Sequence, residues 1–287
     1  MKKLMCAAAL TVAFVAPAIV ASQEVGRNQE TWTWTGRVEN GRWFKLSSVN
    51  GPVSVERSPD NMVHVRAEKE VRRGSVADVA FQVVQSGGDV RICALWRRDY
   101  CDDEGHHSRR GDDDDRNDRD RRDVKVRFTV RVPAGVHVSA GTVNGEMRVR
   151  DVTSDVRAST VNGAVEVLNV GGEVDASTVN GAVDVTTRNG PVNASTVNGD
   201  IDVRMTSIAR DGGMKFHTVN GSITLAMPGS IDADIEMETM HGSIASEYPV
   251  QLSGRFGPRR AKGTIGKGGR RIELETLNGS VELKRAR

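Results

Sequence analysis

The chain has 287 residues, of which 27% are charged and 4% are aromatic, and it contains 30 glycines. This length fits one large all-β domain or two domains of ordinary size, and Val alternating with small or polar residues favours strands over helices. The 40 basic and 38 acidic residues would become equal in number if Lys2 and Lys3 were removed with an N-terminal leader. Global charge therefore gives no support for nucleic-acid binding, and we expect no nucleic-acid partner.

The N-terminus has the pattern of a signal peptide, which we assign to residues 1-22. Lys2 and Lys3 precede an uncharged apolar run at residues 4-20, and two small residues follow it. A transmembrane anchor is the alternative, but the run is short for a span and lacks a basic flank. We expect export to the periplasm, the outer surface or the medium, with no transmembrane segment in the mature chain.

Residues 23-140 are predicted to form an N-terminal β region. Four aromatic residues in its first strands are expected to cap the N-terminal end of the core: Trp32, Trp34, Trp43 and Phe44. Cys93 and Cys101 are the two cysteines left in an exported chain, so we predict a disulfide between them. A metal site that also uses His106 and His107 is the weaker alternative, because a second cysteine pair is missing.

A polar loop bounded by the first cysteine is predicted at residues 93-123. Its segment Asp102–Asp123 interleaves acidic and basic residues, which is typical of a solvated loop. Calcium binding by residues 112-115 is the functional alternative, but the spaced carboxylates of an EF-hand are missing. We predict no bound metal and no cofactor.

Residues 141-287 are dominated by an internal repeat, which we predict to be a solenoid continuous with the N-terminal region. Nonapeptides follow one another from Val143, and alternate nonapeptides resemble each other most, so the true period is 18 residues. An Asn-Gly pair marks each period at Asn144, Asn162, Asn180, Asn198 and, after an insertion, Asn220. Further copies follow at His241 and Asn278, and an earlier one lies at residues 47-55.

The repeat predicts an all-β, parallel β-solenoid with two short strands per 18-residue coil and atypical capping strands at both ends. Each Gly is followed by x-V-x-V, which places the two Val side chains on one strand face and polar residues on the other. Stacked coils would align the Val side chains in a narrow core and the Asn side chains in an amide ladder. An antiparallel meander is the rival architecture, since Asn-Gly also favours hairpins.

Two surface features are candidates for ligand contact. Stacking would align an outward row on the first strand of each coil, namely Arg148, Glu166, Asp184, Asp202 and Thr224. A basic cluster near the C-terminus is a candidate patch for anionic ligands, and it contains Arg255, Arg259, Arg260, Lys262, Lys267, Arg270 and Arg271. A flexible, solvated loop is the simpler interpretation of that cluster.

Taken together, these segments resemble the bacterial β-strand-repeat family of putative adhesins. The similarity rests on the S/T-x-V-N-G-x-V-x-V units, on VRFTVRVPAGVHV at residues 126-138, and on GTIGKGGRRIELETLNGSVELK at residues 263-284. It implies an exported solenoid of unknown function without an established enzymatic activity.

The predicted function is a non-catalytic module that presents a binding or adhesion surface in the cell envelope. No nucleophile elbow, H-E-x-x-H motif or P-loop is present in the sequence. Envelope polysaccharide, lipid headgroups and protein are the candidate partners. An enzyme acting on an envelope polysaccharide is the alternative, since β-helices also support polysaccharide cleavage.

Overall fold

The structure is a computed structural model that describes residues 24-96, 99-107, 123-208, 211-253 and 258-286. The predicted signal peptide and residues 112-115 lie outside the described residues. No helix in the described ranges is long and apolar enough to cross a membrane. The described chain is almost entirely β-structure, with a single 3₁₀ turn, η1 (Val76–Asp78), in its N-terminal part.

The strands form two large sheets and one small one. The first sheet contains, in spatial order, β1 (Glu24–Val25), β6 (Val79–Ser86), β7 (Asp89–Trp96), β3 (Trp43–Ser47), β11 (His137–Gly141), β13 (Val156–Ser159), β15 (Val174–Ser177), β17 (Val192–Ser195), β19 (Met214–Asn220), β25 (Arg271–Asn278), β21 (Ala233–His241), β24 (Arg259–Ile265) and β23 (Gln251–Ser253). The second contains β2 (Thr31–Gly36), β5 (Val63–Arg73), β10 (Asp123–Val132), β4 (Val53–Arg57), β12 (Met147–Arg150), β14 (Val165–Val170), β16 (Val183–Thr187), β18 (Ile201–Met205), β20 (Ile223–Met227), β26 (Val281–Arg285) and β22 (Ile244–Ser246). The small sheet pairs β8 (Tyr100–Cys101) with β9 (His106–His107).

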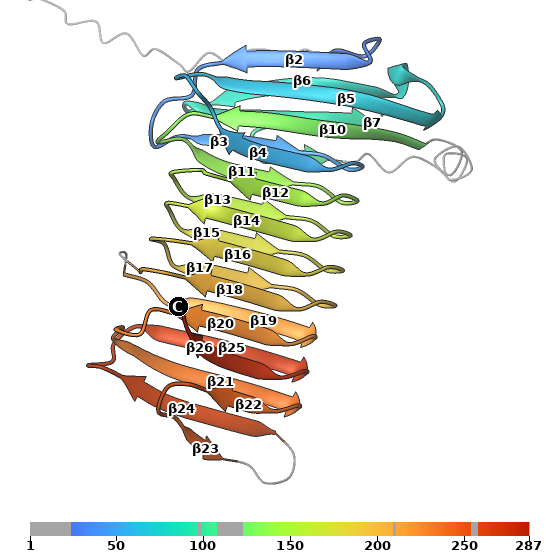
Figure 1. Ribbon diagram of the computed structural model, residues 1–287. Helices are drawn as coiled ribbons and strands as arrows, with labels where there is room; N and C mark the ends of the chain where they lie inside the picture. The colour runs from blue at the N-terminus through green and yellow to red at the C-terminus, as the bar shows by residue number, and fades with distance from the viewer. Residues whose placement is uncertain (1–23, 97–98, 108–122, 209–210, 254–257, 287) are drawn as a thin grey trace, which may run out of the picture.

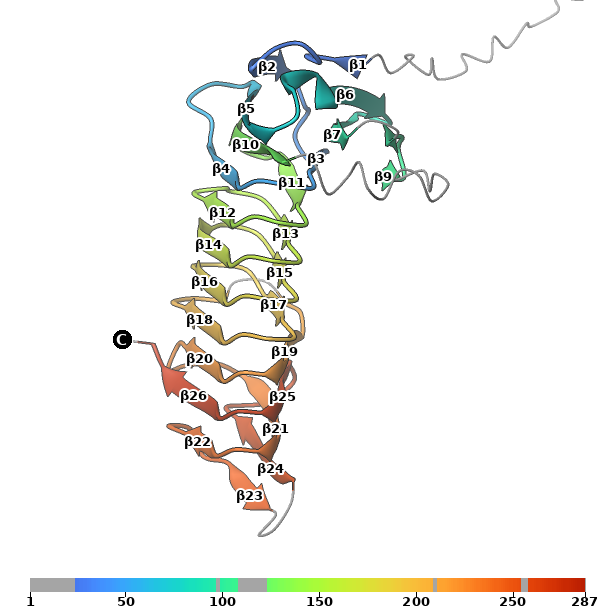
Figure 2. The same ribbon diagram turned by 90° about the vertical axis from the view of Figure 1, so that its right-hand side faces the viewer.

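In the middle of the molecule the chain winds as a two-stranded coil, with one strand in each large sheet (Figures 1 and 2). Strands of successive coils pair in parallel and in register, so that Val165 pairs with Val183 and Val183 with Ile201. Alternate residues of each strand are buried between the two sheets, as in the pattern of β16. The predicted parallel solenoid with two strands per coil is confirmed, and its repeated valines form one narrow hydrophobic spine.

The N-terminal end of the spine is closed by strands that pair differently from the coils. β5 pairs antiparallel with both β2 and β10, and β6 pairs antiparallel with β7. Trp32 stacks on Phe81 at 4.7 Å between ring centroids, and Phe81 meets the edge of Phe128 at 5.8 Å. This aromatic group covers the apolar end that an unpaired coil would expose to water.

Lys69 ties this cap together from inside. Its ammonium group is buried and donates to the carbonyl oxygens of Gly26, Arg27, Val76 and Val79 at 2.6 to 3.0 Å. The four acceptors come from two segments, one before β2 and one around η1, so one side chain fixes both segments to β5. Burial is the main cause that lowers the pKa of Lys69 to about 8, and the charge of Arg27 adds to it.

Trp43 is not part of this cap, contrary to the expectation that all four aromatic residues close the core. Its neighbour Phe44 is completely buried, and because adjacent strand residues point to opposite faces, Trp43 lies on the outer face. There it stacks on His137 at 5.0 Å, and the guanidinium of Arg157 lies 4.5 Å from its ring centroid.

The C-terminal coil is inserted between coils that precede it in the sequence. β25 lies between β19 and β21, and β26 lies between β20 and β22. The register is the same on both sides, since Phe216, Leu274 and Met237 stack in that order. β24 and β23 then close the other end of the first sheet with antiparallel pairing. Atypical strands therefore cap both ends, as predicted.

One hydrophobic cluster runs through the whole described structure, from Trp32 to Leu283. The earlier repeat copy belongs to this stack, because β4 pairs in parallel with β12. The chain leaves the stack after β4, builds the cap, and returns at β11. A division into residues 23-140 and 141-287 remains a proposal about domain organisation, and the two parts share this core.

The repeated glycines give a direct test of the stacking. A Cβ atom added to Gly181 would lie 2.1 Å from the backbone oxygen of Gly163 in the adjacent coil. We predict that Gly181→Ala lowers the free energy of unfolding by more than about 2 kcal/mol, because two backbones would have to separate. Gly229→Ala is the matched control, since no atom lies within 4 Å of its added Cβ. Urea unfolding followed by circular dichroism measures both, and equal midpoints would contradict the close packing.

Candidate functional site

The repeated coils turn at a corner that most often reads Thr-Val-Asn-Gly, and each of its residues has its own structural role. The Thr side chain points inward and is buried, and its hydroxyl donates to a glycine carbonyl of the adjacent coil, as Thr178 does to Gly163 at 2.9 Å. The same bond recurs at Thr160 and Thr196. These hydroxyls satisfy corner carbonyls that would otherwise lack a partner, which explains why Thr recurs at this position.

The asparagines that follow form a continuous amide ladder on the outside of the corner. Asn162 Nδ2 donates to Asn144 Oδ1 at 2.8 Å, and the pattern continues through Asn180, Asn198 and Asn220 at 2.8 to 2.9 Å. The next rung is Asn278, whose Nδ2 donates to Asn220 Oδ1. His241 pairs with Asn278 in the last corner position, beyond the end of the Asn series.

The valines of these corners form an exposed apolar stripe beside the ladder. Val143, Val161, Val179 and Val197 are each 37 to 39% exposed. Leu277 and Met240 occupy the equivalent positions of later corners and are also exposed. Where the Asn series runs, the edge of the solenoid thus presents one apolar and one amide side chain per coil, at the spacing of paired strands.

The predicted outward row exists on the second sheet. Arg148, Glu166, Asp184, Asp202 and Thr224 pair in sequence along neighbouring strands, and Glu282 follows. Arg148 and Arg150 bind Glu166 at 3.0 and 3.2 Å, so the first carboxylate of the row is neutralised. Asp184 forms no ion pair with any described residue. Partial desolvation, then repulsion from Asp202, Glu166 and Asp200, raises the pKa of Asp184 above its ordinary value.

The basic cluster near the C-terminus lies beside acidic residues from other segments of the chain. Arg260 binds Glu238 at 2.9 Å and Lys262 binds Glu236 at 2.7 Å, since β21 lies directly beside β24. Arg271 also binds Glu236, and Arg270 lies 3.7 Å from Asp211. These acids are not apparent from the basic segment itself, because they come from β21 and from the segment before β19.

These ion pairs reduce the free positive charge of the predicted anionic-ligand patch. Arg255 lies outside the described residues. Lys267 follows β24 in a turn, where its backbone N–H donates to Asp232. Of the basic residues on β24, Arg259 forms no ion pair with a described residue. Most of the described cationic charge in this region is therefore already compensated, which weakens it as a site for anions.

The cysteine region contains the predicted disulfide, Cys93–Cys101. The adjacent histidines are engaged with carboxylates rather than with each other, His106 with Asp99 at 3.2 Å and His107 with Asp102 at 2.9 Å. No cluster of three or more His, Cys, Asp or Glu in the described ranges has a geometry that could hold a metal ion.

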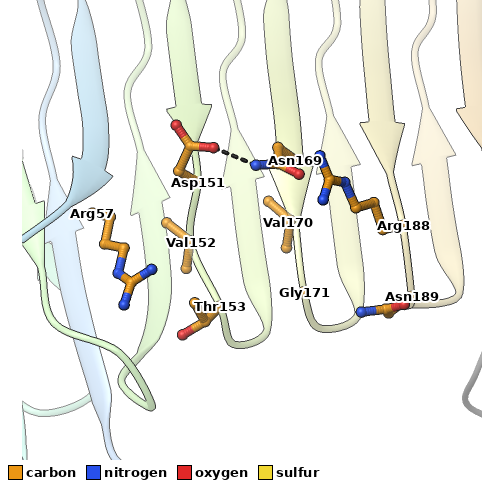
Figure 3. A pocket seen from close by; sticks show the side chains of 9 residues that line it. All are labelled: Arg57, Asp151, Val152, Thr153, Asn169, Val170, Gly171, Arg188 and Asn189. Atoms are coloured by element: carbon orange, nitrogen blue, oxygen red, sulfur yellow. Dashed lines mark hydrogen bonds between the residues drawn. The ribbon is translucent and has the colours of Figure 1, made fainter.

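A polar groove that sequence reasoning did not predict lies at the other corner of the coils. Its volume is about 560 Å³, and its lining comes from four successive coils: Arg57, Asp151, Val152, Thr153, Asn169, Val170, Gly171, Arg188 and Asn189. Figure 3 shows Arg57 and Arg188 at its two ends, with Asp151 and Asn169 between them. Asn169 donates its amide hydrogen to Asp151, and both residues have a φ of 57°.

That left-handed conformation explains the residue types at this corner. Asp and Asn enter the left-handed region more readily than other non-glycine residues, because their short polar side chains bond locally. The sequence signal for this corner was weak, since its residues differ from coil to coil, reading RDVTS, LNVGG and TTRNG. Arg57 and Arg188 are also 131 positions apart, so only the stacking brings them to one groove.

Fold and register define the class of protein: a two-sheet parallel β-solenoid with antiparallel caps. Residues 135-284 match the family described as Toastrack DUF4097. The chain therefore belongs to the Toastrack DUF4097 family, and the resemblance found in the sequence is confirmed. The match begins just before β11 and includes every later coil.

Solved structures of similar shape have low sequence identity to this chain. A "putative adhesin" from Bacteroides fragilis shares 15% identity, with a TM-score of 0.45 over 90% of this chain and 98% of the other. A "putative cell adhesion protein" from Clostridium sporogenes shares 10% identity, with a TM-score of 0.36 over 89% and 99%. A "putative adhesin" from Parabacteroides merdae shares 10%, with a TM-score of 0.29 over 91% and 98%. No curated protein matches the chain.

The raised pKa of Asp184 predicts a pH-dependent effect on stability. The folded state disfavours the charged form of Asp184, so ionisation of this group lowers the stability of the protein. The full loss of stability is present at a pH above the folded-state pKa, and it disappears at a pH below the ordinary pKa of an Asp carboxyl group. We predict that Asp184→Asn raises the urea midpoint at about pH 7 and that this gain shrinks toward about pH 4. Asp175→Asn is the control, since it removes the attraction to Arg157 at 3.6 Å and should not stabilise the protein. A gain that does not change with pH would contradict the electrostatic explanation.

Proposed function

We propose that this protein is an exported, non-catalytic β-solenoid that presents an elongated binding surface in the cell envelope to a polymeric ligand. The observation that carries the proposal is repetition: side chains of one kind align in straight columns along the stack, coil after coil. A surface that repeats along one axis suits a ligand that also repeats along one axis. The stripe of exposed valines, the Asn ladder and the polar groove all extend in this direction.

Rigidity supports a binding role. The repeated coils share in-register backbone pairing, inward Thr hydrogen bonds and a common core, so their surface is held in place before a ligand arrives. A preorganised surface loses less conformational entropy on binding than a flexible one. Neighbouring coils also offer several equivalent contacts, and linked weak contacts add up to a useful affinity.

The disulfide supports export. Disulfide bonds persist in oxidising compartments such as the periplasm or the extracellular space, and they are rare in the cytosol. The bond between Cys93 and Cys101 joins β7 to β8. This fits a protein that folds after passage across the inner membrane, with residues 1-22 acting as its signal peptide.

Fractionation of the native host, followed by polymer binding, tests the proposal. We predict that the protein appears in an extracytoplasmic fraction and that its intact mass corresponds to loss of about the first 22 residues, where the signal pattern ends. The purified mature chain should sediment with envelope polysaccharide from the same host and should release no shortened product from it.

Two results would reject this function. Detection of the intact precursor in the cytoplasm would contradict export. Cleavage of the polysaccharide by the purified chain would favour the enzymatic alternative over the binding role. A heat-unfolded sample of the same chain is the control for nonspecific sedimentation, because it keeps the composition and loses the aligned surface.

A further inference from the structure

The groove at the second corner contains two exposed arginines, Arg57 and Arg188, without an ion pair among the described residues. Arg57 ends β4 and Arg188 follows β16, and both side chains are exposed. Neither forms an ion pair with any residue in the part of the chain that the structure describes. The carboxylates nearest to Arg57 in sequence are occupied elsewhere, Glu56 by Arg131 at 2.8 Å and Asp60 by His64 at 2.9 Å.

The spacing of the two arginines sets the spacing of the charges they can bind. Their strands are separated by three strand-to-strand steps through β12 and β14, which corresponds to about 14 Å. Figure 3 shows the Arg188 side chain reaching toward Asn169 and the Arg57 side chain running alongside Val152 toward Thr153. Each guanidinium group can bind a carboxylate through two parallel hydrogen bonds.

The residues that line the groove between the two arginines favour a part of the ligand that is uncharged and carries hydroxyl groups. Asp151 would repel an anion placed directly above it, whereas its carboxylate accepts hydrogen bonds from hydroxyl groups. Asn169, Thr153 and Asn189 add further donors and acceptors along the groove.

We propose that this groove binds a linear acidic glycan whose carboxylates are separated by neutral sugar units, one carboxylate on Arg57 and another on Arg188. This inference rests on the proposed polymer-binding function and specifies its ligand class. A continuous polyanion such as nucleic acid would place charge over Asp151, and a lipid headgroup would not extend across four coils.

Calorimetric titration of the mature chain with short hyaluronan oligosaccharides tests the inference, because their glucuronate units alternate with neutral sugars. The methyl esters of the same oligosaccharides are the uncharged probe. We expect binding of the acid form, at least tenfold weaker binding of the ester, and at least tenfold losses for Arg57→Gln and for Arg188→Gln. Arg57→Lys and Arg188→Lys should recover part of the affinity, since charge returns without the planar pair of donors.

Arg259→Gln is the matched control, because it removes another exposed arginine, from β24, far along the stack from the groove. It should leave the affinity unchanged, and thermal melting should show that all variants remain folded. The inference is overturned if acid and ester bind equally, if Arg259→Gln weakens binding while the groove variants do not, or if no acidic oligosaccharide binds. Binding of anionic vesicles that depends on Arg57 and Arg188, without glycan binding, would overturn it in favour of a membrane ligand.

These outcomes separate the inference from the broader function. If the chain binds host envelope polymer with equal affinity in the wild type and in both groove variants, polymer binding stands and the acidic-glycan groove fails. If host polymer does not bind at all, the proposed function itself fails.

Discussion

The whole structure depends on the close approach of one coil's backbone to the next at the Asn-Gly corner. At Gly163, Gly181 and Gly199, the position that a Cβ would occupy lies 1.9 to 2.2 Å from the carbonyl oxygen of the neighbouring coil's glycine. Only a residue without a side chain permits this contact. Once the corners touch, the buried Thr hydroxyl and the Asn amide both find partners in the adjacent coil. Strand register, the valine spine and every outward column then follow from the alignment of the corners.

This constraint also explains how the surface is built. In-register stacking aligns the residues at each outward repeat position in a column. The residue type at that position therefore sets the surface along the whole stack, once per coil. Like charges on adjacent strands become neighbours in this arrangement and repel each other. The outward row from Arg148 to Thr224 shows two outcomes of this repulsion. Arg148 and Arg150 neutralise Glu166, whereas Asp184 remains beside other carboxylates and has a raised pKa. On the first sheet the alternation of Arg157 with Asp175 gives attraction in place of repulsion.

The repeated part of the fold was predictable because its signal is local and periodic. The 18-residue period, the alternating valines and the Asn-Gly corners together predict parallel coils, the Asn ladder and the outward row of Arg148 to Thr224. The disulfide was predictable from the isolation of Cys93 and Cys101. What the sequence does not reveal is the order of the coils. Corners at His241 and Asn278 carry the same local pattern, and nothing within either segment indicates that the C-terminal coil is inserted before the one containing His241.

The candidate site was harder to predict for a related reason. The basic cluster was visible as a run of letters, but its partners Glu236 and Glu238 come from a neighbouring strand that only the topology places there. Conversely, Arg57 and Arg188 are single, unremarkable residues in sequence, and the groove between them exists because stacking places their strands three steps apart, with two coils in between. A site that takes one residue from each coil gives no recognisable motif in any single segment of the sequence. The corner motif, in contrast, recurs in each coil and is therefore easy to recognise.

Distances between spin labels on the exposed stripe test the stacking order most directly. With Val143→Cys as the fixed site, the second label is placed at Leu277→Cys or at Met240→Cys, both exposed positions of later corners. Five strand spacings separate the first pair and six the second, so we expect about 24 Å and about 29 Å before the length of the labels is added. A shorter distance to position 277 than to 240 supports in-register stacking with an inserted C-terminal coil. A shorter distance to 240, or distances that do not follow the strand spacing, would contradict it.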